Sequence, residues 1–162
     1  MTVPSPAGAR GFTLIELMVS LAIVAILGTL LVPVAQRSMQ RSREQELRHD
    51  LREIRQAIDA YKRAWDEGRI EKDAADSGYP ASLDVLVKGV TDLRSPARRT
   101  LYFLRRVPRN PFSTDATLAA AQTLGLRSYS SEADAPQAGE DVYDVYVPQA
   151  LTGLNGVPYA LW

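Results

Sequence analysis

The sequence predicts an α+β protein in which one long N-terminal helix packs on a small antiparallel β-sheet. Three observations carry this prediction. An apolar run without charge extends from Leu17 to Ala35, a stripe of apolar residues at helical spacing follows as far as Trp65, and short segments rich in valine and tyrosine lie near the end of the chain. A helix with one apolar stripe and a few short strands make a single small core.

The apolar run is long enough to cross a membrane. Phe12 to Ala35 is roughly 24 residues, and a helix that rises about 1.5 Å per residue crosses a bilayer core of about 30 Å within that length. Glu16 is the single charged residue in the run. A carboxylate in hydrocarbon costs a few kcal/mol or more, so Glu16 predicts either a partner or a function.

After the apolar run, the helix changes character. The segment 36–46 is polar and is expected to protrude between the membrane and the folded domain. A regular stripe then begins, with apolar residues at alternating steps of four and three: Leu47, Leu51, Ile54, Ile58, Tyr61 and Trp65. The stripe is too short for a typical coiled-coil seam, and its length favours a helix that packs on a sheet.

The remainder of the chain is predicted to contain one short helix and a few strands. The segment 66–78 is charged and glycine-containing, which is typical of a loop. A short helix is expected from Pro80 to Gly89, and the proline-interrupted segment 90–100 is expected to be a surface loop. The run from Leu101 to Leu104 is too short to assign by periodicity.

Three strands are expected in the C-terminal part. Two of them are Leu126–Ser130 and Val142–Val147. The third is the last strand of a terminal hairpin, in which the Asn155–Gly156 turn closes on Tyr159–Trp162. Together they would form a sheet against the second half of the long helix.

The composition excludes several classes of function. Lysine plus arginine equal aspartate plus glutamate at 19 each, so no excess of positive charge points to nucleic acid. The chain has no cysteine and one histidine, His49, which falls on the side of the helix opposite the stripe. No serine or carboxylate pair stands in a recognisable catalytic frame. The sequence therefore predicts a protein that is not an enzyme.

The residues Gly11-Phe12-Thr13-Leu14-Ile15-Glu16 resemble the processing site of type IV pilins and type II secretion pseudopilins. This resemblance implies a pilin-like fold. It also implies that a prepilin peptidase cuts after Gly11 and methylates the new terminal amine of Phe12. Glu16 would then pair with the terminal amine of a neighbouring subunit, and Pro33 stands where the family usually has a helix-kinking proline.

Other interpretations of the N-terminal region are open to the sequence. A plain membrane anchor and an ordinary secretory signal peptide both combine a charged leader with an apolar run, although a signal peptide has a shorter run with its cleavage site behind it. The arginines after the run, Arg37, Arg41 and Arg43, outnumber the single Arg10 before it, which opposes a cytoplasmic N-terminus. Pro33 predicts a kink or a locally melted stretch of helix. It is either a passive kink tolerated in a membrane helix or a hinge used during assembly.

The C-terminal half resembles the major pseudopilin of type II secretion, the G-type subunit. The similarity lies in the segment 107–112 and in the segment 141–146, which follows an acidic loop. Asn110 and Phe112 depart from the aspartate and tryptophan that the family usually has there. A minor pseudopilin or a type IV pilus subunit is the alternative within the family.

The acidic loop between the two expected strands is a candidate calcium site. It holds four carboxylates and two hydroxyl groups from Ser130 to Asp141, and calcium takes six to eight oxygen ligands. A solvated acidic loop is the alternative, because the spacing does not match an EF-hand. The resemblance implies that Asp134 and Asp141 are the side-chain ligands of Ca²⁺.

The resemblance divides the chain into four parts: a leader of residues 1–11, a transmembrane and assembly helix at 12–35, an amphipathic helix at 36–66, and a periplasmic domain at 67–162. It implies a single-pass protein of the inner membrane, with a cytoplasmic N-terminus before processing. The expected partners are copies of the chain in a helical filament, other pseudopilins, the prepilin peptidase and the inner-membrane assembly platform. Its function would be to drive protein export across the outer membrane. A single-span anchored periplasmic binding module is the rival from another class.

Overall fold

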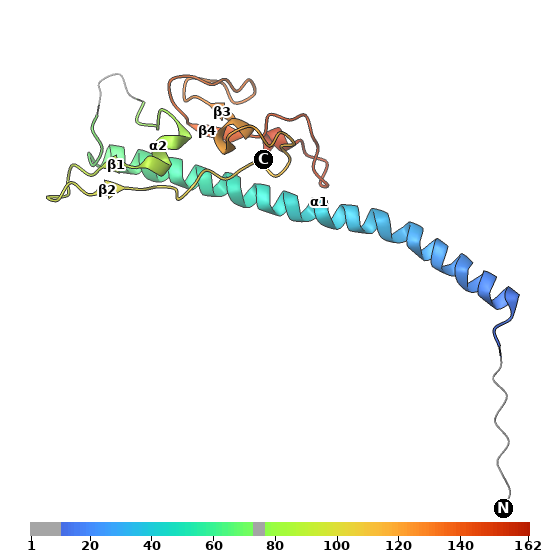
Figure 1. Ribbon diagram of the computed structural model, residues 1–162. Coiled ribbons are helices and arrows are strands. Elements are labelled where there is room, and N and C mark those ends of the chain that lie inside the picture. The colour runs from blue at the N-terminus through green and yellow to red at the C-terminus, as the bar shows by residue number, and fades with distance from the viewer. Residues whose placement is uncertain (1–10, 73–76) are drawn as a thin grey trace, which may run out of the picture. The chain divides into compact units, whose positions relative to one another are not determined.

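The computed structural model describes residues 11–72 and 77–162, and the side chains of residues 30 and 31 are not among those described. The predicted leader lies outside the described residues, except for Gly11. The chain divides into two units, Met1–Gln40 and Arg41–Trp162. Helix α1, Leu14–Asp66, runs through both of them (Figure 1).

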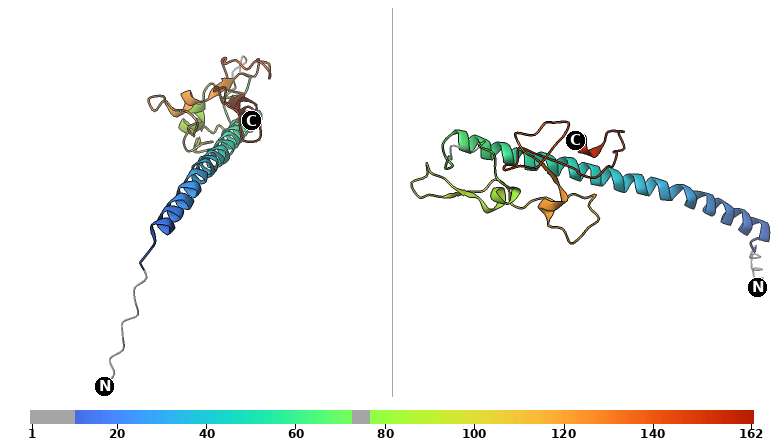
Figure 2. Two further views of the ribbon diagram at one scale, coloured as in Figure 1. Left: turned by 90° about the vertical axis from the view of Figure 1, so that its right-hand side faces the viewer. Right: turned by 90° about the horizontal axis from the view of Figure 1, so that it is seen from above.

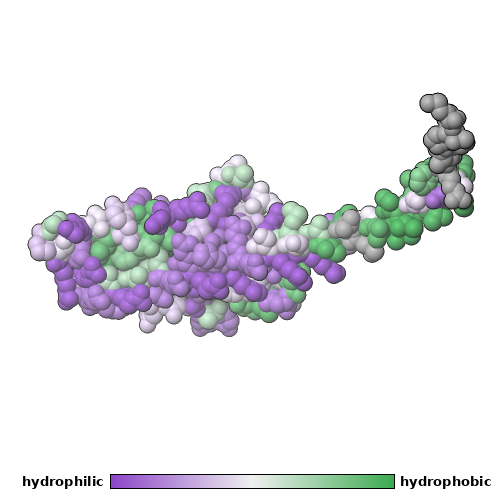
Figure 3. Space-filling model, turned by 90° about the horizontal axis from the view of Figure 1, so that it is seen from below, coloured by the Kyte–Doolittle hydropathy of each residue, from purple (hydrophilic) through white to green (hydrophobic). Residues whose placement is uncertain are grey.

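The part of α1 in the first unit carries a long apolar segment. Its described large side chains between Phe12 and Val34 are exposed, and hydrophobic residues predominate on the face of this segment that Figure 3 shows. The segment is long and apolar enough to cross a membrane. The helix continues through Pro33 without a break. Of the two alternatives that the sequence predicted at Pro33, a kink or a locally melted stretch, the structure excludes the melted stretch. An apolar environment would favour the remaining backbone hydrogen bonds.

In the second unit, α1 supplies one wall of the core, as its stripe predicts. Leu47, Leu51, Ile54 and Ile58 are fully buried, and Tyr61 is partly buried against Phe103, with ring centroids 5.4 Å apart. The opposite wall comes from several short elements, and its buried residues are Leu83, Leu86, Leu104, Leu124, Val142, Val145, Val147 and Tyr159. Burial of each large side chain stabilises the fold by roughly 1.5–3 kcal/mol.

The short elements lie along the second half of α1 (Figures 1 and 2). Helix α2, Leu83–Lys88, confirms the predicted short helix, with Leu83 and Leu86 facing the core. Strands β1, Val90–Thr91, and β2, Thr100–Leu101, pair antiparallel. The predicted surface loop 90–100 therefore contains β1, the first residue of β2 and the turn between them, and Leu101 belongs to β2. Gly89 requires its glycine, because a Cβ there would lie 2.6 Å from the carbonyl oxygen of Leu101.

The second sheet pairs β3, Gly125–Arg127, with β4, Asp144–Tyr146. β4 falls inside its predicted range, and β3 overlaps its range but begins one residue earlier, at Gly125. Leu126 lies opposite Val145 in an antiparallel register. The 3₁₀ helix η1, Ala120–Thr123, precedes β3. The structure thus has two antiparallel two-stranded sheets in place of one sheet of three strands.

The predicted terminal hairpin is wrong in its last strand. A tight turn does form at Asn155–Gly156, and the amide of Gly153 donates to the carbonyl of Val157 at 2.9 Å. Pairing is limited to one bridge, between Thr152 and Pro158. The chain then enters a 3₁₀ helix, η2, Tyr159–Leu161, which turns Tyr159 into the core. An aromatic anchor, and not a strand, fixes this end of the domain.

Candidate processing and assembly site

The start of α1 places the motif residues within one turn. Thr13 precedes the helix, and its hydroxyl oxygen accepts a hydrogen bond from the amide of Glu16 at 3.3 Å. A threonine in this position satisfies one of the free amides at the helix start, and an acidic residue in the first turn is favoured by the helix dipole. The sequence therefore begins the helix two residues after Phe12, with Glu16 on its first turn.

The predicted cleavage site is exposed among the described residues. Apart from its chain neighbours, none of them has an atom within 4 Å of a Cβ built on Gly11, and Phe12 is 81% exposed. Gly11, Phe12 and Glu16 are thus brought together at one end of α1. Pro33 lies about five turns further along the same helix and is not part of this cluster.

The acidic loop is anchored at one of its two predicted ligands. The carboxylate of Asp141 accepts hydrogen bonds from the Ser128 hydroxyl at 2.7 Å, from the Tyr129 amide at 2.9 Å, and from the Ser77 hydroxyl. Ser131 closes the loop itself, since its hydroxyl accepts from the amide of Gln137 at 2.8 Å. Asp134 is exposed. The loop is therefore closed by hydrogen bonds in the absence of any disulfide.

These contacts fit calcium only in part. A carboxylate has about four acceptor sites, and the donors to Asp141 already fill at least three of them. Within residues 11–72 and 77–162, the groups of three or more metal-binding side chains include neither Asp134 nor Asp141. A calcium ion would need backbone carbonyl oxygens of the loop as additional ligands, which calcium sites commonly use.

The hydrogen bonds to Asp141 also set its protonation. Burial raises the pKa of Asp141, but the donors Ser128, Ser77 and the Tyr129 amide outweigh burial, and its pKa is lowered from the ordinary value. The folded state thus gains stability from the ionised form. That gain is complete above the unfolded pKa of about 3.9 and is lost as the pH falls through the lower folded pKa.

Acid should therefore destabilise the domain, and Asp141→Asn should reduce the effect. We expect the urea midpoint of the wild type to fall between about pH 5 and about pH 2, with a smaller fall for the variant. Asp92 and Asp115 also have lowered pKa values, so part of the fall persists. If the urea midpoints of the two proteins fell equally with pH, this would contradict the conclusion that ionised Asp141 stabilises the folded state.

A second set of polar contacts, which the sequence did not predict, holds the C-terminal segment on α1. Glu44 is 6% exposed, and its carboxylate accepts from the Leu154 amide at 2.8 Å and the Tyr159 hydroxyl at 2.9 Å. This corrects the prediction that segment 36–46 protrudes throughout. The signal was available, since Glu44 precedes Leu47 by three residues and so continues the buried stripe.

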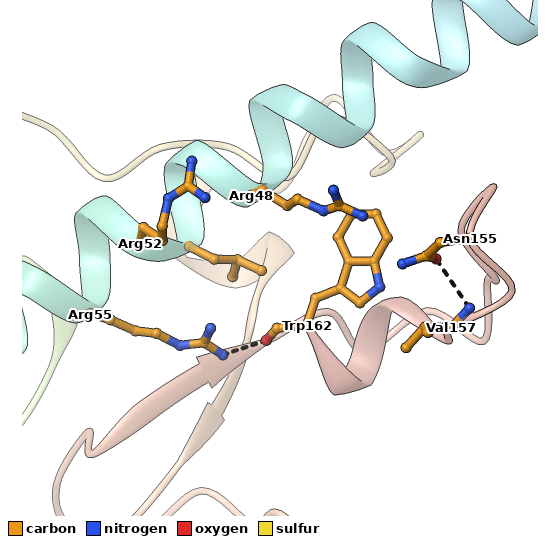
Figure 4. Close-up of a pocket in the computed structure, with 7 residues that line it drawn as sticks. Arg48, Arg52, Arg55, Asn155, Val157 and Trp162 are labelled. Carbon is orange, nitrogen blue, oxygen red and sulfur yellow. Dashed lines mark hydrogen bonds between the residues drawn. The ribbon is translucent and has the colours of Figure 1, made fainter.

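Arg55, also on α1, makes a second set of contacts with the C-terminal part of the chain. Its guanidinium donates to Asp144 Oδ1 at 2.7 Å and to the Val145 carbonyl at 3.0 Å. It also donates to the main-chain oxygen of Trp162 at 2.7 Å, a bond drawn in Figure 4. Arg48 lies over the Trp162 ring, 4.0 Å from its centroid. A planar guanidinium with several donors suits such a junction of three chain segments.

Asn110 is a third polar residue with a structural role. It is 1% exposed, and its side chain donates to the Thr123 carbonyl and to the side chain of Gln149 while accepting from the Phe112 amide. His49, by contrast, is exposed and contacts Glu53 at 3.9 Å, as its position on the helix predicts.

Comparisons with known proteins agree with the N-terminal motif. A model of the prokaryotic N-terminal methylation motif matches residues 7–32. The type II secretion system core protein G of Klebsiella michiganensis is 28% identical over 82% of this chain and 89% of its own length. The protein of the same name from Pseudomonas aeruginosa is 29% identical over 81% of this chain and 88% of its own length. The one from Pectobacterium carotovorum is 31% identical over 67% of this chain and 65% of its own length. The comparison with solved structures gave no match.

A long apolar helix that begins inside the methylation motif, and whose second half packs on short antiparallel strands, fits a membrane-anchored pilin-like protein. The methylation motif and the core protein G relatives support membership of the pseudopilin family. The family is one of structural subunits.

Proposed function

We propose that this chain is the major pseudopilin of a type II secretion system, a structural subunit that polymerises with copies of itself and with other pseudopilins. One observation carries the proposal. The Gly11-Phe12 site and Glu16 stand together at the start of an apolar helix whose side chains find no partner within the described chain. Similarity to the core G proteins over most of both chains supports the same role.

In the proposed pathway, the precursor inserts into the inner membrane once, with its N-terminus in the cytoplasm and its folded domain in the periplasm. A prepilin peptidase cleaves after Gly11 and methylates Phe12. An assembly platform in the membrane then adds subunits to the base of the filament. The apolar helices pack together, and Glu16 of the incoming subunit neutralises the terminal amine of a neighbour. Growth of the filament pushes exported proteins outward, so the role includes no catalytic step.

The intact mass of the protein from membranes of its native host tests this proposal. We expect a chain that begins at N-methylated Phe12. A chain that retains residues 1–11 in cells with active prepilin peptidase would contradict the proposal and indicate a plain membrane anchor. A chain cut behind residue 35 would indicate an ordinary signal peptide.

Calcium binding by Asp134 and Asp141 stays a prediction. If the loop binds calcium, millimolar Ca²⁺ should stabilise the full chain in detergent by roughly 2–3 kcal/mol over EGTA, which thermal unfolding would register as a rise of several degrees. Asp134→Ala should abolish this response and leave the stability in EGTA unchanged, because Asp134 is exposed. Equal midpoints of the wild type in Ca²⁺ and EGTA would exclude the site.

A further inference from the structure

Charged side chains on α1 form two rows, one on each flank of the buried stripe. The basic row consists of Arg48, Arg52 and Arg55, and the acidic row of Glu46, Asp50 and Glu53. At about 100° per residue, each row lies roughly 90–120° around the helix from the stripe. The two rows therefore face opposite sides of the domain.

The basic flank borders an open hollow of about 340 Å³ (Figure 4). Besides the arginines, it is lined by Leu51, Asn155, Val157 and Trp162. Arg55 is held by Asp144 and the main chain, and Arg48 lies against Trp162. Arg52 is exposed, and the structure gives its guanidinium neither a hydrogen bond nor an ion pair with the described residues. The hollow thus presents one cation that the fold does not use.

The acidic flank borders a second hollow, of about 350 Å³. It is lined by Glu46, His49, Asp50, Glu53, Arg106, Val107, Pro108 and Arg109. Arg109 donates to main-chain oxygens of Leu118 and Asp115, which leaves Arg106 and His49 near the carboxylates. Burial and the neighbouring Glu46 raise the pKa of Asp50 despite these cations. The flank therefore gains from an additional positive charge.

We propose that, in the filament, the basic flank of one subunit packs against the acidic flank of the next, with Arg52 opposite Glu46 and Asp50 of the neighbouring copy. The inference rests on the proposed function, because it names the contact by which this subunit pairs laterally with itself. The two flanks are different patches of one surface, so the contact is heterologous. Repetition of a heterologous contact that does not close produces an open helical array.

Electrostatic complementarity of this kind fixes register and suppresses wrong pairings. Arg52 and Glu46 lie roughly 120° apart on the helix, so they are poorly placed to pair within one subunit. A second copy of the chain brings them together and pairs the guanidinium that the fold leaves unused.

A charge exchange at these two positions tests the contact. Arg52→Glu and Glu46→Arg, made separately in the full chain, should each reduce filament yield by roughly tenfold or more, which corresponds to about 1.4 kcal/mol. The double variant restores opposite charges and should recover most of the wild-type yield. Arg94→Glu, an equal charge change at an exposed residue away from both flanks, should assemble normally. Sheared filaments would be measured with the host's secretion machinery present.

Wild-type yield from Arg52→Glu, or no recovery in the double variant, would overturn the inference. These outcomes differ from failure of the proposed function. If the proposed function were wrong, the wild-type chain itself would form no filament. Unfolding midpoints of the single variants in detergent should match the wild type, since neither side chain is buried.

Cross-linking gives an independent readout, because the chain has no cysteine. A variant with both Arg52→Cys and Glu46→Cys should form a ladder of multimers when membranes are treated with a short bismaleimide. Each single variant should remain monomeric, since a heterologous contact places unlike residues opposite each other. Strong dimers from a single variant would indicate a symmetric interface and overturn the proposal.

Discussion

Replacement of Glu16 by alanine is expected to abolish filament formation while insertion, cleavage and methylation continue. Glu16 lies on the first turn of α1, five residues from the cleavage site, and the Thr13 side chain meets only its main-chain amide. Its carboxylate is therefore available to another subunit. Cleavage requires access to Gly11 and Phe12, both of which are open and do not depend on Glu16.

The size of the effect follows from the electrostatics of assembly. Two unit charges 4 Å apart attract by about 4 kcal/mol at an effective dielectric constant of about 20. Without the carboxylate, the terminal amine of the neighbour would be buried in an apolar environment with no counter-charge, which adds a desolvation penalty. A loss of about 4 kcal/mol per step lowers the association constant roughly a thousandfold.

Two quantities are measured: the yield of sheared filaments, which reports assembly, and the intact mass of the membrane-bound subunit, which reports processing. Glu16→Gln should fail as well, because it keeps the shape of the side chain and loses its charge. Glu71→Ala, which removes an exposed glutamate from the second unit, should assemble normally. Normal filaments from Glu16→Ala would remove the role assigned to this carboxylate, whereas an uncut chain would move that role to processing.

The part of the fold that was predictable from sequence is the part built from local periodicity. The stripe from Leu47 to Ile58 identified the buried face of α1 because a helix repeats its faces every three to four residues. The short helix α2 was equally visible, since proline precedes it and glycine ends it. The N-terminal motif was predictable for another reason, because its residues are adjacent in the chain.

The long-range polar contacts were not predictable. Glu44 meets Tyr159, and Asn110 meets Gln149, across separations that no local pattern encodes. The same limit applies to Arg55 and Trp162. The burial of Glu44 could be inferred from its place in the stripe, but the partners of these side chains could not, because only the tertiary fold brings the partners to them.

Strand pairing was predicted in location but not in arrangement. β3 and β4 fall where valine, leucine and tyrosine predict strands, yet the sequence predicts a loop where β1 and β2 form a hairpin. Strands of two or three residues are shorter than the four to eight over which alternation can be recognised. At the C-terminal end, Tyr159 is buried and packs 4.5 Å from the Phe112 ring, and this packing replaces the expected strand.

Asn110→Ala is expected to produce a large loss of stability. The variant would leave the Thr123 carbonyl, the Gln149 side chain and the Phe112 amide without the partner that each now has. An unsatisfied polar group that stays buried costs about 1–3 kcal/mol, and water can reach the partly buried members of this set. The free energy of unfolding should therefore fall by roughly 2–4 kcal/mol. Phe112 would also lose the anchor that holds its ring against Tyr159.

Urea unfolding of the full chain in detergent, followed by the fluorescence of Trp65 and Trp162, measures this loss. Asn155→Ala is the matched control, because Asn155 is an exposed asparagine that accepts one hydrogen bond, from the Val157 amide at 3.1 Å. It should cost less than about 1 kcal/mol. Equal losses in the two variants would mean that Asn110 does not hold the segments together. A large loss at position 110 alone would identify this residue as the polar centre of the domain, in a chain that has no disulfide to perform that role.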